Sequence, residues 1–140
     1  MREILFRGKR EDCGEWTEGY LFKQWNRTFL LWGMTGDIPN MTEVIPETVG
    51  QYTGLTDKNG KKIFEGDIIK AITLDTGSEE IAVVCFGNFI DENNGDDYIG
   101  FYIEFCGIKT TITQLAMEEC KNRIEIIGNI FDNPELLEGE

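Results

Sequence analysis

The sequence predicts a mainly β protein of the β-rich α+β class. We expect a small antiparallel barrel-like domain with an N-terminal β-hairpin lobe and one short C-terminal helix. Short runs that alternate apolar and polar residues recur along the chain, and each is bounded by turn residues, including many of the 16 glycines. With 140 residues, 41% of them hydrophobic, the chain can bury about two-thirds of its unfolded surface in one core.

The N-terminal part predicts a strand followed by a hairpin. Residues 2–7 alternate, with Ile4 and Phe6 on one face, before the polar loop GKREDCGE. The runs GYLFKQ and RTFLLW are separated by Trp25 and Asn26, and Gly33 is expected to close the second run. This spacing is typical of a β-hairpin.

The stretch 34–46 is expected to be an irregular crossing. It contains Gly36, Pro39 and Pro46, which interrupt regular structure. It is therefore the predicted boundary within a single domain of residues 1–140, between an N-terminal lobe of residues 1–48 and a barrel-like lobe of residues 49–140.

The segment VGQYTGLTDKNGKKIFEGDIIK, residues 49–70, holds two turns around the short apolar step Ile63-Phe64. Asn-Gly supplies the positive φ angles that a tight hairpin needs, and an Asp side chain can accept backbone N–H bonds in such a turn. Glycine at a corner permits a sharp bend between barrel strands. The expected structural turn residues are Asp57, Asn59, Gly60, Gly66 and Asp67.

The second half predicts further strands over residues 67–74, 80–86, 98–105 and 123–131. The first three should form an antiparallel meander, and Gly100 indicates a bulge. A short helix is expected over residues 113–121, and Pro134 should open a helical turn near the C-terminus.

The charge is unevenly distributed along the chain. Residues 1–70 contain 10 Lys/Arg and 11 Asp/Glu, whereas residues 71–140 contain 3 and 15, within a net charge of −13. Such a field disfavours non-specific DNA binding, because that binding depends on Lys and Arg displacing counterions. The acidity serves either solubility or attraction of a basic partner.

The residue composition limits where the protein is expected to act and which reactions it could catalyse. No apolar run reaches the length of a membrane span, and the first residues lack a signal-peptide pattern, so we expect a cytoplasmic protein without a membrane partner. Four scattered cysteines are expected to be reduced thiols. The chain has no His, which removes Ser-His-Asp and Cys-His arrangements and the common zinc ligand sets, and no cofactor is predicted.

Oxygen-bearing side chains gather in the predicted hairpin tip around Asp91, Asp96 and Asp97. Hard cations take oxygen ligands, but the glycine and closing Glu of an EF-hand are not in place. We therefore assign no metal site and interpret the tip as solvated charge, with a weak Ca²⁺ site as the alternative.

Two groups are candidates for binding. Gln51, Tyr52 and Thr53 could form a pocket wall, although Tyr52 would serve equally well as a core residue with a bonded hydroxyl. The aromatic-rich N-terminal part offers Trp25 beside Arg27, which would mark a contact surface if exposed, for a protein or for stacked single-stranded bases.

Three blocks together resemble one family. REILFRGKR near the start, VGQYTGLTDKNGKKIFEGDII in the middle and IEIIGNIFDNPELL at the end are similar to the signature blocks of the YopX family. That resemblance implies a β-rich fold and an uncharacterised accessory role in a bacteriophage or prophage. It implies no catalytic residues.

Three functions follow as hypotheses. The first is a non-enzymatic module that binds a host or phage protein, with a homo-oligomer as a related expectation. The second is a nucleic-acid-related module, either a single-strand binder or an acidic DNA mimic. The third is a carboxylate- or metal-dependent hydrolase, and no catalytic residue is assigned.

Overall fold

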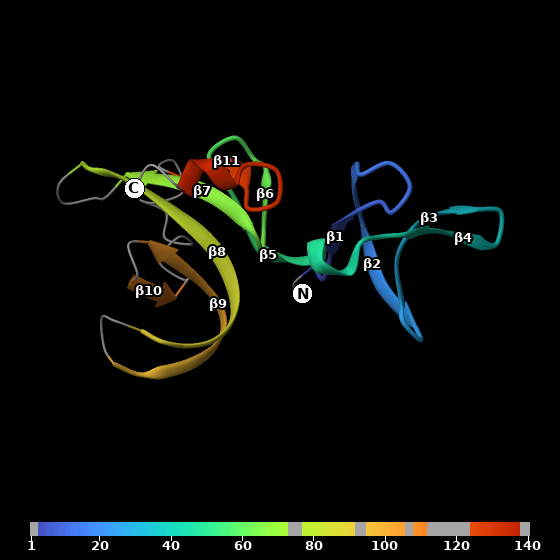
Figure 1. Ribbon diagram of the computed structural model, residues 1–140, viewed down its shortest axis with the longest axis horizontal. Coiled ribbons are helices and arrows are strands. Elements are labelled where there is room, and N and C mark those ends of the chain that lie inside the picture. The colour runs from blue at the N-terminus through green and yellow to red at the C-terminus, as the bar shows by residue number, and fades with distance from the viewer. Residues whose placement is uncertain (1–2, 73–76, 92–94, 106–107, 112–123, 138–140) are drawn as a thin grey trace. The chain divides into compact units, whose positions relative to one another are not determined.

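The computed structural model describes residues 3–72, 77–91, 95–105, 108–111 and 124–137. The chain divides into two compact units, Met1–Gly54 and Leu55–Glu140. Strands dominate both units, as Figure 1 shows, and the predicted β-rich class is confirmed.

The first unit is built on antiparallel strands that lie in the order β4-β3-β2-β1-β5. The elements are β1 (Phe6–Lys9), β2 (Trp16–Gln24), β3 (Arg27–Thr35), β4 (Ile38–Glu43), the 3-10 turn η1 (Pro46–Thr48) and β5 (Gly50–Thr56). The predicted hairpin is confirmed as β2 and β3, and the first predicted strand begins later, at Phe6.

Strand β2 changes partner at Gly19. Residues 16–19 pair with β1, whereas residues 20–24 pair with β3. A Cβ built at Gly19 would overlap the carbonyl oxygen of Leu31. Only glycine permits this close approach of two backbones, and it thereby allows one strand to serve both neighbours.

The prediction of an irregular crossing over residues 34–46 is wrong, because β4 occupies its middle. Pro39 breaks no ladder bond there, since β4 is an edge strand and a proline can sit where its missing N–H would face outward. Gly36, with φ +63°, instead forms the turn between β3 and β4. Gly33 does not end β3 but marks a shift in register between Trp32 and Met34.

The second unit contains a five-stranded sheet in the order β10-β9-β8-β7-β11. Its elements are β6 (Lys62–Phe64), β7 (Asp67–Ile72), β8 (Glu79–Ile90), β9 (Asp97–Phe105), β10 (Ile108–Thr111), β11 (Ile124–Asn129) and the 3-10 turn η3 (Pro134–Leu137). Strand β6 lies beside β5, whose last residues belong to this unit. Across the described residues the strands thus form two antiparallel sheets, and neither closes into a barrel.

The core of the second unit lies on one face of its sheet. The buried cluster consists of Ile63, Ile69, Ala82, Val84, Ile103 and Ile124. Ile63 and its neighbour Phe64 are almost fully buried, which confirms that the short apolar step anchors the return strand. The packing therefore joins β6 to four strands of the sheet.

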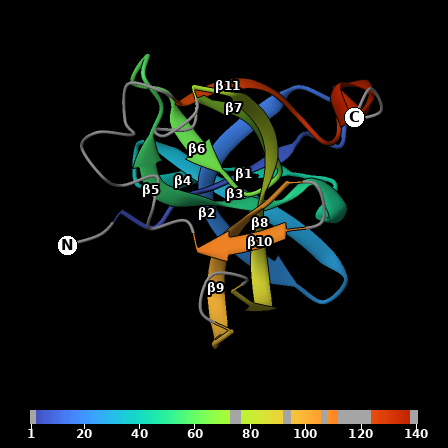
Figure 2. The same cartoon turned by 90° about the vertical axis from the view of Figure 1, so that its left-hand side faces the viewer.

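Strands β8 and β9 run side by side and curve together (Figure 1; Figure 2). The predicted meander is confirmed, but the bulge at Gly100 is not, because the register from Val83 to Ile90 is continuous. Gly100 faces Gly87 across the ladder, and the ring of Phe89 lies 4.6 Å from that of Tyr102 beside this pair. Aromatic packing next to paired glycines replaces the side chains that the glycines lack.

The end of the chain is only partly described. The helix expected over residues 113–121 lies outside the described residues. The expected helical turn is present as η3, a 3-10 turn that begins at Pro134. Strand β10, which pairs with β9, was not predicted from the sequence.

Candidate functional site

The Asp57 carboxylate organises the first turn of the 49–70 segment. Its Oδ1 accepts the backbone N–H groups of Asn59 and Lys61, each at 2.9 Å. Its Oδ2 accepts the N–H of Ile126 in β11 at 3.1 Å, and Asp57 is buried. Gly60 completes the turn with φ +81°. One carboxylate thus closes the hairpin and ties it to a distant strand.

The second turn has a similar structural function. Oδ2 of the buried Asp67 accepts the N–H of Phe64 at 2.8 Å. Gly66, with φ +94°, donates to the carbonyl of Val84 and accepts from the N–H of Ile130. Backbone groups of neighbouring strands therefore occupy the polar atoms of this turn, and the segment that is densest in turn signals serves the architecture.

The three candidate pocket residues lie on β5. Tyr52 and Thr53 are buried, Gln51 is half-buried, and the N–H of Tyr52 donates to the carbonyl of Leu5 at 2.7 Å. Gln51 stands opposite Phe6 in the ladder between β1 and β5. This placement favours packing within the first unit for Tyr52.

One face of β2, β3 and β4 presents an apolar surface, which we call the apolar face. Cross-strand neighbours share a face of a sheet, so the register defines its members. They are Tyr20, Leu31 and Met41 in one row, and Phe22 and Phe29 in the next. Tyr20 is 60% exposed, Phe22 40% and Met41 51%, whereas Phe29 is buried beneath them.

Trp25 and Arg27 lie at the end of this face. Trp25 forms the β2–β3 turn with φ 55° and is 92% exposed. The Arg27 guanidinium lies over the Phe29 ring at 4.9 Å and makes two hydrogen bonds to Glu43, of 2.8 and 3.3 Å. These hydrogen bonds, with the attraction of opposite charges, hold the pKa of Glu43 below its usual value. The Trp25 side chain is therefore exposed to solvent, whereas the Arg27 guanidinium is paired with Glu43.

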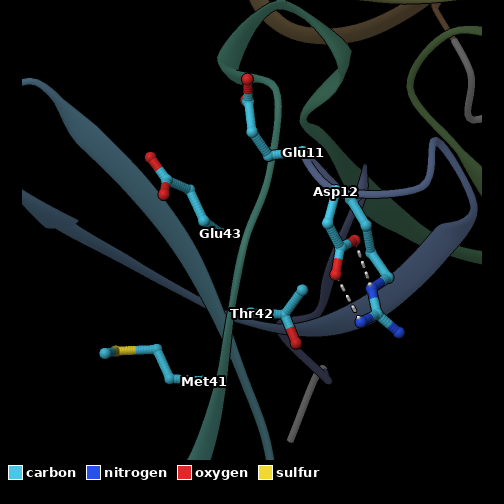
Figure 3. A pocket seen from close by; sticks show the side chains of 6 residues that line it. Glu11, Asp12, Met41, Thr42 and Glu43 are labelled. Carbon is cyan, nitrogen blue, oxygen red and sulfur yellow. Dashed lines mark hydrogen bonds and ion pairs between the residues drawn. The ribbon is translucent and has the colours of Figure 1, made fainter.

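A pocket of about 280 Å³ lies at the outer side of β4 (Figure 3). It is lined by Arg10, Glu11, Asp12, Met41, Thr42 and Glu43. Met41 and Glu43 project to one side of β4 and Thr42 to the other, as alternation along a strand requires. Met41 and Glu43 also belong to the rows of the apolar face, so the pocket adjoins that face.

The charges that line the pocket are three carboxylates and one guanidinium. Arg10 binds Asp12 through two hydrogen bonds, of 3.0 and 3.2 Å, and these bonds hold the pKa of Asp12 below its usual value. On the opposite side of β4, the Trp32 indole donates to the Thr42 hydroxyl at 2.7 Å. The pocket is therefore negative, with an apolar contact at Met41.

The candidate metal residues do not come together as a ligand set. Asp91 is buried, and its Oδ2 accepts the N–H of Thr111 at 3.1 Å, whereas Asp96 and Asp97 are exposed. Among the residues that the structure describes, no group of three or more Cys, Asp and Glu could hold a metal ion. The contacts of Asp91 instead join the β8–β9 end to β10.

Sequence reasoning missed the pocket residues. The sequence predicts only a polar loop for the run GKREDCGE, and Met41 to Glu43 lie in the stretch expected to be irregular. One signal was available: Met41 and Glu43 alternate with Thr42 immediately after a proline, which is a pattern compatible with an edge strand. The meeting of residues 10–12 with residues 41–43 depends on register, which the sequence does not display.

The comparisons with known proteins bear on the whole chain. A protein of known structure, described as "Crystal structure of protein EF1440 from Enterococcus faecalis", is 20% identical. The match covers 98% of this chain and 99% of that chain, with a TM-score of 0.49. No curated protein matches. Within the described residues, no helix is long and apolar enough to cross a membrane.

The family comparison is more informative. Residues 5–138 match the family described as YopX protein. The match includes both the first unit with its apolar face and the second unit with its Asp57 turn. This chain therefore belongs to the YopX family.

Proposed function

We propose that this chain is a non-enzymatic accessory protein that binds a protein partner through the apolar face. The observation that supports the proposal is the number of large apolar side chains left open on three adjoining strands and their turns. On the apolar face Tyr20, Phe22 and Met41 are at least 40% exposed, and Trp25 is 92% exposed in the β2–β3 turn. Trp32 and Ile38 are also exposed, but they lie on the other face of these strands, with Thr42. Exposed aromatic and Met side chains concentrated in one region are typical of protein contact sites.

The electrostatics favour a protein over a nucleic acid as the partner. Base stacking on aromatic side chains is accompanied by cationic groups that follow the phosphates. Here Arg27 is bound to Glu43 and Arg10 to Asp12, so acidic side chains already occupy both guanidinium groups. The two arginines nearest the apolar face are thus already paired with carboxylates, which disfavours single-strand binding there.

We place this function in the setting that the family implies. The protein would act for a bacteriophage or prophage in the host cytoplasm, on a host or phage protein. The acidic second half, which carries most of the net charge, would maintain solubility while the near-neutral first half makes the contact.

Affinity capture from nuclease-treated lysate of phage-carrying host cells tests the proposal. The bait is the full chain, compared with the Tyr20→Ala/Trp25→Ala variant and with Ile99→Ala, which removes an exposed apolar side chain from β9. We expect a protein captured by the wild type and by Ile99→Ala to be lost from the double variant, because exposed aromatic residues dominate contact energies. Capture that persists in the double variant, or that requires nucleic acid, would contradict the proposal.

A further inference from the structure

Among the residues that the structure describes, only part of the outer edge of β4 is paired. In the antiparallel ladder with β3, the N–H of Val44 donates to the carbonyl of Thr28. Backbone groups of alternate residues point to opposite sides of a strand, so those of Glu43 and Met41 point away from β3. The carbonyl of Glu43 does so, since it accepts the N–H of Glu11 at 2.9 Å. Strand β4 is also the last strand at this end of its sheet.

This edge already accepts a strand over part of its length. Arg10 forms an antiparallel bridge with Val44, and the N–H of Ile45 donates to the carbonyl of Lys9 at 2.8 Å. The loop then turns back, with the N–H of Gly14 donating to the carbonyl of Arg10. Pairing on the outer side therefore ends at Glu43, and Met41 lies beyond the point where the loop leaves.

The pocket lies at this same point. Its lining combines Met41 with the carboxylate of Glu11, and with Glu43, whose carboxylate also binds Arg27. A Lys side chain can lay its methylene groups along an apolar surface while its ammonium group meets carboxylates. Pro39, which has no N–H to donate, limits further pairing toward the start of β4. The usable edge is short, and the Glu11 carboxylate beside it favours a basic ligand.

We propose that the outer edge of β4 binds an extended segment of a partner protein by strand addition, with a Lys or Arg side chain of that segment in the pocket. This inference rests on the proposed function and specifies the partner's chemistry. The added strand would continue the line that residues 9–11 begin, with its basic side chains on the face of Met41 and Glu43 and the residues between them on the Thr42 face. Backbone bonds supply affinity in such complexes, and side-chain pockets supply specificity.

A designed peptide provides the test. The probe is a capped heptapeptide of alternating Val and Lys, titrated into the ¹⁵N-labelled full chain at low salt and followed by NMR. We expect the amide signals of Glu11, Met41 and Glu43 to shift. The same peptide with Glu in place of Lys should leave them unchanged, because the pocket is negative.

Two variations separate strand addition from simple charge attraction. Two peptides would carry N-methyl groups on alternate residues, one at the odd positions and one at the even positions. One of them should lose binding and the other should keep it, since only one set of N–H groups can face β4. The Glu11→Gln variant should bind the Lys peptide about threefold more weakly, as expected for one exposed charge pair.

Several outcomes would overturn the inference. They are equal effects of both methylated peptides, no loss of affinity in Glu11→Gln, shifts confined to other residues, or no shifts at all. Concentration-dependent shifts of the same amides without peptide would assign the edge to a second copy of the chain. The result of the capture experiment does not depend on any of these outcomes. The strand-addition inference can therefore fail while the proposed function stands.

Discussion

The hairpin around Asp57 and the sheet of β2, β3 and β4 use their polar and apolar groups in opposite ways. At the hairpin, a buried carboxylate is surrounded by three backbone N–H groups, and Ile63 is fully buried nearby in sequence. On the sheet, Tyr20 and Trp25 are open to solvent. In the hairpin, polar groups are hydrogen-bonded within the protein and apolar side chains are buried. On the sheet, large aromatic side chains remain exposed to solvent. The most distinctive sequence motif is therefore structural, and the surface that we propose for binding lies elsewhere.

The largest effect should come from removing the Asp57 carboxylate. Asp57→Ala leaves three backbone N–H groups without their acceptor and separates the hairpin from β11, so we expect a loss of about 4 kcal/mol in the free energy of unfolding. Urea unfolding followed by hydrogen exchange at the Ile126 amide measures it. Asp37→Ala, in the exposed turn between β3 and β4, should change stability by about 0.5 kcal/mol or less. Equal effects of the two variants would refute the assigned role of Asp57.

Core packing in the second unit gives the next prediction. Ile63→Ala should lower the free energy of unfolding by about 3 kcal/mol, because Ile63 is fully buried among the sheet residues. Ile99→Ala removes a side chain that is 79% exposed and should cost about 0.5 kcal/mol or less. Thermal or urea unfolding of both variants checks the contrast. A small effect at Ile63 would mean that the short apolar step does not anchor the hairpin.

A glycine tests the sheet of the first unit. Gly19→Ala places a Cβ against the Leu31 carbonyl, where β2 changes partner, so the backbones must separate. We expect a loss of about 2 kcal/mol, as is usual for overpacking. Hydrogen exchange should show the loss in β2 and β3 and spare the amides of β8 and β9. Unchanged protection of β2 would contradict the close approach described above.

The smallest effect concerns the Arg27–Glu43 pair and depends on pH. Because the pKa of Glu43 is lowered in the folded state, the pair stabilises the fold above the unfolded pKa, near 4.5, and this contribution disappears as the pH falls through the folded pKa. Glu43→Gln should thus be less stable than the wild type at pH 6 and should match it more closely at pH 3. Urea unfolding at both values measures the difference. A difference independent of pH would exclude the ion pair as its source.

The sequence was a good guide where local chemistry decides the structure. Alternation and turn residues predicted the β2–β3 hairpin, the meander of β7 to β9 and the burial of Ile63. The same signals failed at β4. A proline such as Pro39 would interrupt an interior strand but is tolerated at a sheet edge, and the whole fold decides which strand lies at the edge.

The surface that we propose for binding was predictable only in part. Trp25 was a candidate from composition, and its exposure follows from its place in a turn. The rows of the apolar face depend on the register of three strands, and the pocket depends on residues 10–12 meeting β4. Neither the apolar face nor the pocket has a local signal in the sequence, so only the folded structure shows them.

Site-specific photo-crosslinking tests the central claim most directly. The photoreactive residue p-benzoylphenylalanine would replace Phe22 in one protein and Phe86 in another, both exposed phenylalanines but one on the apolar face and the other on β8. After irradiation in phage-carrying host cells, we predict a discrete protein adduct at position 22 and none at position 86. An adduct at position 86 alone would contradict the assignment of partner binding to the first unit.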